Sequence, residues 1–204
     1  MLGVDQTLDI GLDLVSWWGQ IDLFTYSYAW AGDPKEINHD LYAQIPDNDV
    51  RKGQFVNAYG NGTLYPINKF YHPDRTVAGQ RNVTTDYVYM RIAEMYLLLA
   101  ESAADTGDDD TAREALRDLL EERIDDTSYL DALTGQQLAD EIYLQTRIEL
   151  WGEGKVYLAG KRLGKTATLG SNHLTYPGRT VPFNSDEMTF EIPQSERQNN
   201  PNIN

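Results

Sequence analysis

Residues 86–105 carry two apolar stripes at helical spacing, and this segment constrains the fold more than any other part of the chain. The first stripe consists of Ile92, Met95, Tyr96, Leu99 and Ala103, and the second of Met90, Ala93, Leu97, Ala100 and Ala104. The polar residues Arg91, Glu94 and Glu101 occupy the narrow remaining face. A helix that is apolar around most of its circumference is normally buried between neighbours. We therefore predict a helix over 86–105 with Leu99 in the core, and exposed apolar surface wherever the chain cannot cover both stripes.

A short acidic turn leads from this segment to a second predicted helix over 111–123. Gly107 suits the left-handed conformation that follows many helix C-termini. The aspartates at 108–110 supply an N-cap and favourable charge for the positive end of the next helix. The apolar side of that helix consists of Ala112, Ala115, Leu116, Leu119 and Leu120. The pattern predicts an antiparallel hairpin that resembles one tetratricopeptide unit, without a second copy at a period of about 34 residues.

A third helix is predicted to begin at Thr134, because Thr134 and Gln137 have the spacing of a capping box. Its inward residues are expected to be Leu138, Ile142 and Leu150. Gly152 and Gly154 then break or kink the helix before an amphipathic stretch over 156–163.

Charge and composition exclude several functions. The net charge of −15 argues against binding to nucleic acid or to anionic lipid, which require clustered Lys and Arg. The absence of cysteine excludes disulfides, thiolate nucleophiles, Fe–S clusters and cysteine zinc sites. No apolar run approaches the ~20 residues of a transmembrane helix, and the first residues lack the pattern of a signal peptide. We expect no cofactor, no metal site and no catalytic residue.

Four short segments form an ordered set over residues 41–202. They are 45–51 (IPDNDVR), 89–101 (YMRIAEMYLLLAE), 147–155 (RIELWGEGK) and 190–196 (FEIPQSE), the last followed by Asn-Pro-Asn at 200–202. In this order and spacing the set resembles the SusD/RagB family of outer-membrane nutrient-binding lipoproteins. The chain departs from the family pattern at 157–160 and at Arg197, where an apolar residue is expected. Family members are longer and begin with a lipidated cysteine, so we expect this chain to be the C-terminal portion of a family domain.

The resemblance implies a mainly α fold, a tetratricopeptide-like helical hairpin scaffold with a loop-rich, aromatic-rich annex. Residues 1–84 would form the loop-rich, ligand-facing region, 85–163 the helical scaffold and 164–204 a turn-rich tail, in one packed unit. It also implies a function without catalysis: a subunit at the cell surface, in the outer membrane, that binds an oligosaccharide or other nutrient. Its partner would be a TonB-dependent, SusC-like transporter, over which it acts as a lid.

An aromatic stretch at 17–30 is the best candidate for ligand contact. Phe24, Tyr26, Tyr28 and Trp30 alternate with smaller residues, so an extended backbone would place all four rings on one face. Flat aromatic faces suit the C–H faces of sugar rings. The expected ligand-binding residues are Trp17, Trp18, Tyr26, Tyr28 and Trp30. The alternative is a half-buried strand that packs these rings against the helices.

Two Arg/Glu pairs are interpreted as structural and not catalytic. Arg91 and Glu94 have the i,i+3 spacing of a helical ion pair, and Arg147 lies close to Glu149 in sequence. Two other functions remain open. The chain could be a tetratricopeptide-like interaction module without a small-molecule ligand. It could also be a glycan-active enzyme, although no acid pair stands out among its 32 acids.

Overall fold

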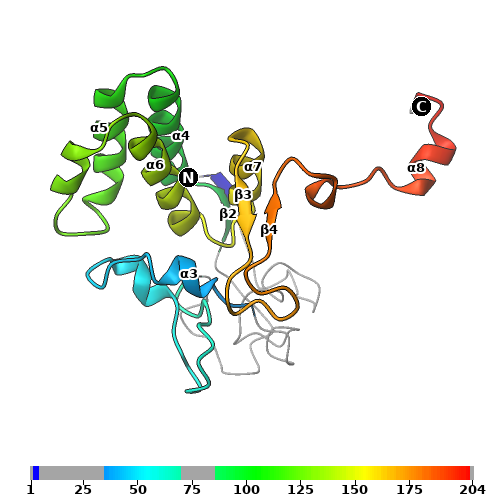
Figure 1. Ribbon diagram of the computed structural model, residues 1–204, viewed down its shortest axis with the longest axis horizontal. Helices are drawn as coiled ribbons and strands as arrows, with labels where there is room; N and C mark the ends of the chain where they lie inside the picture. Colours follow the sequence, from blue (N-terminus) through cyan, green and yellow to red (C-terminus); the bar gives the residue numbers. More distant parts are fainter. Residues whose placement is uncertain (1, 5–34, 70–85, 203–204) are drawn as a thin grey trace. The chain divides into compact units, whose positions relative to one another are not determined.

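The computed structural model describes residues 2–4, 35–69 and 86–202 (Figure 1). These residues form a mainly helical structure with two small two-stranded sheets, which confirms the predicted fold class. The chain divides into two compact units, Met1–Val156 and Tyr157–Asn204. The sequence predicts one packed unit with a change of composition after residue 163, whereas the boundary between the units falls inside helix α7 (Lys155–Arg162).

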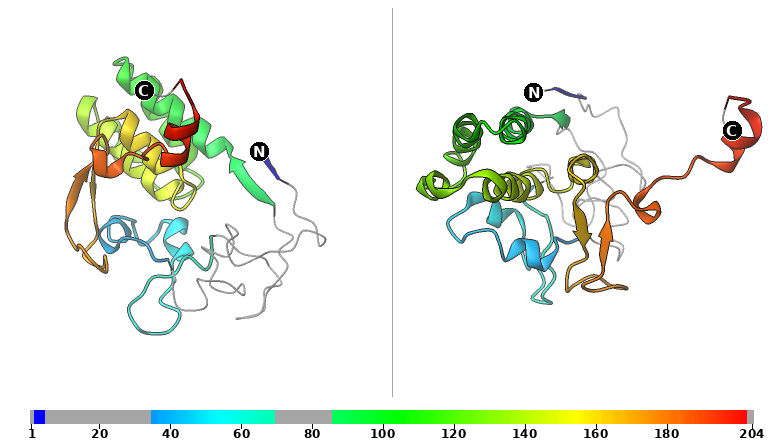
Figure 2. Two further views of the ribbon diagram at one scale, coloured as in Figure 1. Left: turned by 90° about the vertical axis from the view of Figure 1, so that its right-hand side faces the viewer. Right: turned by 45° about the horizontal axis from the view of Figure 1, so that its top comes forward.

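The segment predicted as one helix over 86–105 is a strand followed by a helix. Strand β2 (Tyr87–Met90) pairs antiparallel with β1 (Leu2–Val4), and helix α4 (Ile92–Asp105) begins only after Arg91 (Figures 1 and 2). Arg91 itself is extended, with φ −120° and ψ 153°. The sequence Tyr-Val-Tyr-Met consists mainly of residue types that favour strands. The helical prediction was therefore wrong at its start, because a short apolar run fits either period.

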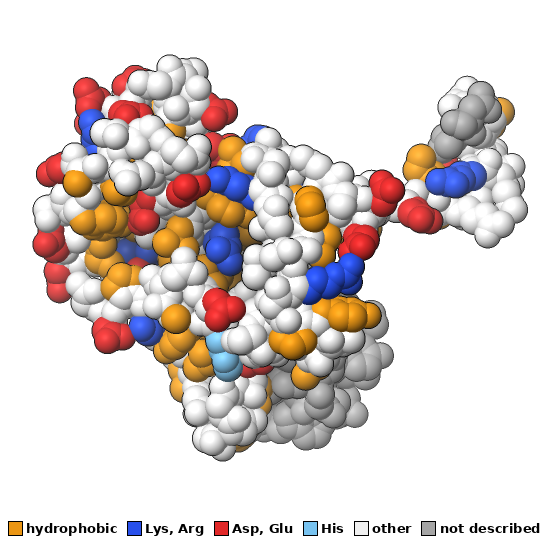
Figure 3. Space-filling model, viewed as in Figure 1, with side chains coloured by type: hydrophobic (Ala, Val, Ile, Leu, Met, Phe, Trp, Pro, Cys, Tyr) orange, Lys and Arg blue, Asp and Glu red, His pale blue; other side chains and the backbone are white. Residues whose placement is uncertain are grey.

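Helix α4 and helix α5 (Asp109–Leu120) form the predicted helical hairpin. Gly107 has φ +79° in the connecting turn, and the Asp108 carboxylate accepts a hydrogen bond from the Thr111 amide at 3.1 Å. Both roles agree with the sequence prediction, although α5 begins at 109 and ends at 120 instead of spanning 111–123. The solvent side of α5 is acidic, and Figure 3 shows red side chains along its outer edge (upper left).

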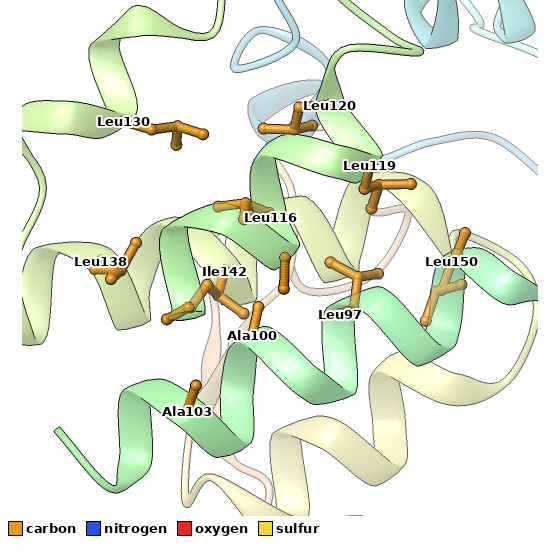
Figure 4. Close-up of a cluster of buried hydrophobic side chains, with 13 residues drawn as sticks. Leu97, Ala100, Ala103, Leu116, Leu119, Leu120, Leu130, Leu138, Ile142 and Leu150 are labelled. Carbon is orange, nitrogen blue, oxygen red and sulfur yellow. The ribbon is translucent and has the colours of Figure 1, made fainter. Parts of the chain in front are cut away.

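The main core lies among α4, α5 and helix α6 (Gly135–Glu149). In Figure 4, Leu97 and Ala100 of α4 point towards the leucines of α5. Small side chains at the contact allow the helices to approach closely; they are Ala93, Ala100, Ala103, Ala112 and Ala115. Leu138, Ile142 and Leu150 are buried here, as the sequence predicts.

Most of the α4 side chains in this core come from the second of the two apolar stripes, and the first contributes only Ala103 and the partly buried Tyr96. Leu97 and Ala100 from the second stripe are buried at 2% and 0% exposure, whereas Ile92 and Leu99 from the first are 67% and 51% exposed. The prediction that Leu99 is a core residue was therefore wrong. The reason is geometric, since α5 and α6 both pack against the same face of α4. Ile92, Met95, Leu98 and Leu99 remain exposed, which confirms the predicted exposed apolar surface.

The predicted capping box at the start of α6 is absent. Neither Thr134 nor Gln137 makes a side-chain cap, and the two residues share only a backbone hydrogen bond. Instead, the Gly135 amide donates to the carboxylate of Asp109, at 2.9 Å. A carboxylate from α5 thus satisfies an amide of the next helix, a tertiary contact that local spacing cannot reveal.

A second core joins the 35–69 segment to α6. Helix α3 (His39–Tyr42) and the 3₁₀ helix η1 (Val50–Gln54) lie in this segment. A further 3₁₀ helix, η2 (Ser128–Ala132), lies outside it and precedes α6. The buried residues of this second core are Ile37, Leu41, Ile45, Phe55 and Ile148. Because Ile148 lies in the last turn of α6, the second core is adjacent to the C-terminal end of that helix.

The unit Tyr157–Asn204 contains the rest of α7, a hairpin and two short helices. Strands β3 (Thr166–Thr168) and β4 (Thr180–Pro182) pair antiparallel, followed by η3 (Asp186–Met188) and α8 (Gln194–Asn199). Gly160 packs against the ring of Phe183, and a Cβ at this position would lie 2.5 Å from the ring carbons. The close approach explains why glycine occupies this position in the segment that departs from the family pattern.

A matched pair of substitutions tests the orientation of α4. Leu97→Asp removes a buried side chain and buries a charge without a partner, so it should lower the free energy of unfolding by more than about 2–5 kcal/mol, the cost of a Leu truncation alone. Leu99→Asp should cost less than about 1 kcal/mol, because its side chain is half-exposed. Chemical denaturation of both variants measures the difference. Equal destabilisation by the two variants would contradict this orientation.

Candidate functional site

The predicted ligand-binding residues lie outside the described residues. They are Trp17, Trp18, Tyr26, Tyr28 and Trp30. Among the described residues, the most concentrated chemistry is a buried ion network at the end of α6, with a shallow cavity beside it.

Glu149, the last residue of α6, lies at the centre of the network with only 4% of its surface exposed. Its carboxylate accepts hydrogen bonds from Arg123 at 3.0 Å through both oxygens, from Arg91 at 2.9 Å and from Arg51 at 3.3 Å. Its backbone carbonyl accepts hydrogen bonds from Lys69 at 2.7 Å and from Arg91 at 2.9 Å. Cations are favourable here, because the C-terminal end of a helix is its negative end.

Arg51 forms the part of the network that belongs to η1. Its side chain is 2% exposed, and it binds the carboxylate of Asp49, which is 3% exposed, at 2.6 to 3.2 Å. It also donates to the side-chain oxygen of Gln145 on α6, at 2.6 Å. The same Asp49 carboxylate accepts the backbone amide of Arg51, at 2.8 Å, and so caps η1. Asp49 therefore orients the arginine while it neutralises its charge.

Arg91 connects the network to the turn that follows α6. Its guanidinium binds Glu149 and both carboxylate oxygens of Glu153, at 2.8 and 3.0 Å. Lys69 also approaches Glu153, at 3.1 Å. The predicted pairing of Arg91 with Glu94 was wrong, because Glu94 instead pairs with Lys155 at 3.1 Å. Since Arg91 precedes the helix, the i,i+3 rule does not apply to it.

Arg147, which the sequence places close to Glu149, takes no part in the network. It forms no ion pair within the described ranges. Arg147 precedes Glu149 by two residues on α6, and side chains two residues apart on a helix do not face each other. Glu149 therefore has its structural contacts with Arg51, Arg91 and Arg123, and not with Arg147.

Burial and charge act in opposite directions on the ionisable groups of the network. Burial alone would raise the pKa of Glu149, but Arg123 and Arg91 outweigh it and lower that pKa to about 2. For Lys69 burial dominates and lowers the pKa to about 8, with Glu153 offsetting part of the effect. Glu149 therefore stays ionised at neutral pH and holds its cations.

Three of the sequence segments that resemble a known family meet at this network. The segment 45–51 supplies Asp49 and Arg51, and the segments 89–101 and 147–155 supply Arg91 and the two glutamates. The sequence analysis missed Arg123 and Lys69, which lie in no motif. The network consists of four cations and three carboxylates, and each carboxylate is paired with a cation. This complete pairing suits a structural role.

A shallow cavity of about 490 Å³ lies beside η1. Its lining residues are Tyr42, Asp47, Asn48, Asp49, Val50, Lys52, Gly53 and Phe55. The rings of Tyr42 and Phe55 meet edge to face with centroids 6.3 Å apart, and Phe55 meets Trp151 in the same way at 5.0 Å. The cavity combines aromatic rings with carboxylate, amide and ammonium groups, the composition expected of a polar ligand site.

Two further observations concern only the described ranges. In them, no group of three or more His, Asp or Glu side chains is placed to hold a metal ion. None of their helices has the length and apolar character needed to cross a bilayer.

The family model and three of the solved structures that match this chain concern SusD or SusD-like proteins. A model of the SusD family matches residues 48–204. A SusD superfamily protein from Bacteroides thetaiotaomicron is 26% identical over 81% of this chain and 38% of its own, with a TM-score of 0.62. A SusD-like carbohydrate-binding protein from Bacteroides vulgatus is 25% identical over 80% of this chain and 40% of its own, with a TM-score of 0.60.

Another structural match extends over nearly the whole chain. A further SusD superfamily protein from Bacteroides vulgatus, 20% identical, covers 98% of this chain and 44% of its own length, with a TM-score of 0.72. The chain thus spans less than half the length of these solved structures. No curated protein matches it.

The low pKa of Glu149 predicts acid sensitivity. A carboxyl group with a folded pKa of about 2 and an ordinary value of 4.5 contributes stability above pH 4.5, which is lost as the pH falls towards 2. This contribution should be about 3 kcal/mol. We expect Glu149→Gln to be less stable than the native chain at pH 7, with the difference shrinking between pH 4.5 and 2 in urea titrations.

The control for this measurement is Glu114→Gln, which removes an exposed carboxylate without an ion pair in the part of the chain that the structure describes. This variant should follow the native chain at every pH. A difference between Glu149→Gln and the native chain that stays constant from pH 7 to pH 2 would show that Glu149 is not held ionised by its arginines.

Proposed function

The chain belongs to the SusD family, and on this premise we propose that it is a carbohydrate-binding subunit of a TonB-dependent nutrient-uptake complex at the outer-membrane surface. The family match over residues 48–204 is the observation that carries the proposal. The buried ion network supports it, because the motif residues Asp49, Arg51, Arg91 and Glu149 are engaged with one another and hold a scaffold together.

The proposal includes a role in binding without catalysis. General acid and base catalysis by carboxyl groups requires a pair of acids that can reach a substrate and exchange protons with it. Glu149 has a pKa of about 2 and is surrounded by arginines, so it would hold no proton to donate near neutral pH. Asp49 is likewise buried against Arg51. These acids support a structural role for the network.

We propose that the aromatic stretch at 17–30 supplies the principal sugar contacts. The alternation of Tyr26, Tyr28 and Trp30 with smaller residues favours a row of rings on one face of an extended segment. Such rings stack on the C–H faces of sugars, and the tyrosine hydroxyls can reach sugar hydroxyls. Trp17 and Trp18 would extend the same surface.

A protein-interaction role is the second candidate, and one observation favours it. Ile92, Met95, Leu98 and Leu99 present an exposed apolar face on α4, opposite the face that contacts α5 and α6. Contiguous exposed apolar side chains mark interaction surfaces in many proteins. A transporter-bound subunit would need both a sugar site and a partner surface, so the two candidates are compatible.

Alanine substitutions at Tyr26, Tyr28 and Trp30 test the proposed sugar contacts. If a ring stacks on a sugar, its removal should weaken binding by about 1–3 kcal/mol with little change in melting temperature. If it is a core residue, its removal should instead lower the free energy of unfolding by about 3–5 kcal/mol. Calorimetric titration with a panel of oligosaccharides and thermal melting of the same samples separate the two results.

Tyr176→Ala is the matched control, since it removes an exposed tyrosine outside this stretch. It should change neither binding nor melting strongly. Loss of stability with intact affinity in the three stretch variants would move these rings from the binding site to the core. Turnover of any oligosaccharide in the panel by the native chain would contradict a role in binding alone.

A further inference from the structure

The cavity beside η1 has features that the buried network does not use. Its volume of about 490 Å³ lies within the range of small-ligand sites. It is bordered by an aromatic ring, Tyr42, and by the polar side chains of Asp47, Asn48 and Lys52. We infer that this cavity is a second carbohydrate subsite, which takes one uncharged sugar ring. The inference rests on the proposed function and places one part of the ligand at a defined position.

The aromatic wall of the cavity is held in place by its neighbours. Tyr42 is half-buried and meets Phe55 edge to face, while Phe55 is 3% exposed and packs on Trp151. The Lys52 ammonium lies 5.1 Å from the centroid of the Tyr42 ring. These contacts fix the ring before any ligand arrives, so little conformational entropy would be lost when a sugar binds.

The polar groups at the cavity retain hydrogen-bonding capacity. Lys52 donates to the Ile45 carbonyl at 2.8 Å and to one carboxylate oxygen of Asp47 at 2.7 Å, which leaves one of its three N–H donors. The other Asp47 oxygen and the Asn48 side-chain amide have no hydrogen bond among the described residues. A sugar hydroxyl both donates and accepts. The unused donor, acceptor and amide therefore match what one pyranose ring offers.

The loop that carries these groups is anchored at its base. The Asp49 amide donates to the Pro46 carbonyl at 3.1 Å, and the Val50 amide donates to the Arg123 carbonyl at 3.0 Å. Asp49 itself is locked to Arg51 inside the network. The cavity thus lies on a loop that is fixed by these backbone hydrogen bonds and by the buried ion pair.

The charges at the cavity select an uncharged sugar. The Lys52 charge is already offset by Asp47, and Asp49 lies on the same wall. The whole chain carries a net charge of −15. A uronic acid or sulfated sugar would therefore meet repulsion, whereas a neutral ring would not.

The test uses the full chain and two cavity variants, Asn48→Ala and Asp47→Asn. Both side chains are exposed, so both variants should fold, and their melting curves verify this. Gln137→Ala is the matched control, because it removes an exposed amide on α6 without a side-chain cap bond. The probes are maltoheptaose, cellohexaose, xylohexaose and mannohexaose, with oligogalacturonate as the anionic probe. Titration calorimetry gives affinities, and amide chemical shifts locate the contact.

We expect at least one neutral probe to bind and to shift the side-chain amide signal of Asn48. Asn48→Ala should weaken that binding about fivefold, as the loss of one hydrogen bond predicts, and Asp47→Asn should also weaken it. Gln137→Ala should leave it unchanged. Unchanged affinity in both cavity variants, or binding of oligogalacturonate alone, would overturn the subsite and leave the proposed function intact. Binding of no probe by the native chain would overturn both.

Discussion

The buried carboxylate of Glu149 connects three separate segments of the larger unit to α6. It lies at the C-terminal end of α6, and its cations come from the residue before α4, the turn after α5 and η1. Burying a carboxylate is costly unless cations and hydrogen bonds replace its water. Each cation is therefore constrained by the same centre, and so is the backbone that carries it. The cavity beside η1 owes its defined shape to this arrangement.

Apolar packing and the ion network have different tasks in this unit. The leucines and alanines of α4, α5 and α6 supply the hydrophobic free energy that keeps the helices together. Buried ion pairs contribute little net stability compared with well-packed apolar residues, but they are strongly destabilising when one partner is removed. The network therefore determines how the segments are aligned with one another. It fixes the position of the 35–69 segment against the end of α6 more precisely than the apolar cluster that contains Phe55 and Ile148 does.

Local signals could predict much of the fold, and tertiary contacts explain the rest. The turn at Gly107, the cap at Asp108 and the apolar side of α5 depend on neighbouring residues, so the sequence predicted them correctly. The exposure of Leu99 depends on which face α5 and α6 cover, and periodicity cannot decide between two apolar stripes. The network joins residues up to 98 positions apart, from Arg51 to Glu149. The motifs identified most of its members but not their pairing, and the aromatic stretch at 17–30 stays a prediction.

The most direct test of this account is a double-mutant cycle between Arg51 and Glu149, measured as free energy of unfolding at neutral pH. Arg51→Met and Glu149→Met should each cost about 3–5 kcal/mol, because the first leaves the buried Asp49 carboxylate without its cation and the second removes the carboxylate that three arginines share. The double variant should cost at least about 1 kcal/mol less than the sum, while a cycle of Arg147→Met with Glu149→Met should be additive. Additivity within about 0.5 kcal/mol for Arg51 and Glu149 would contradict the claim that the network acts as one unit.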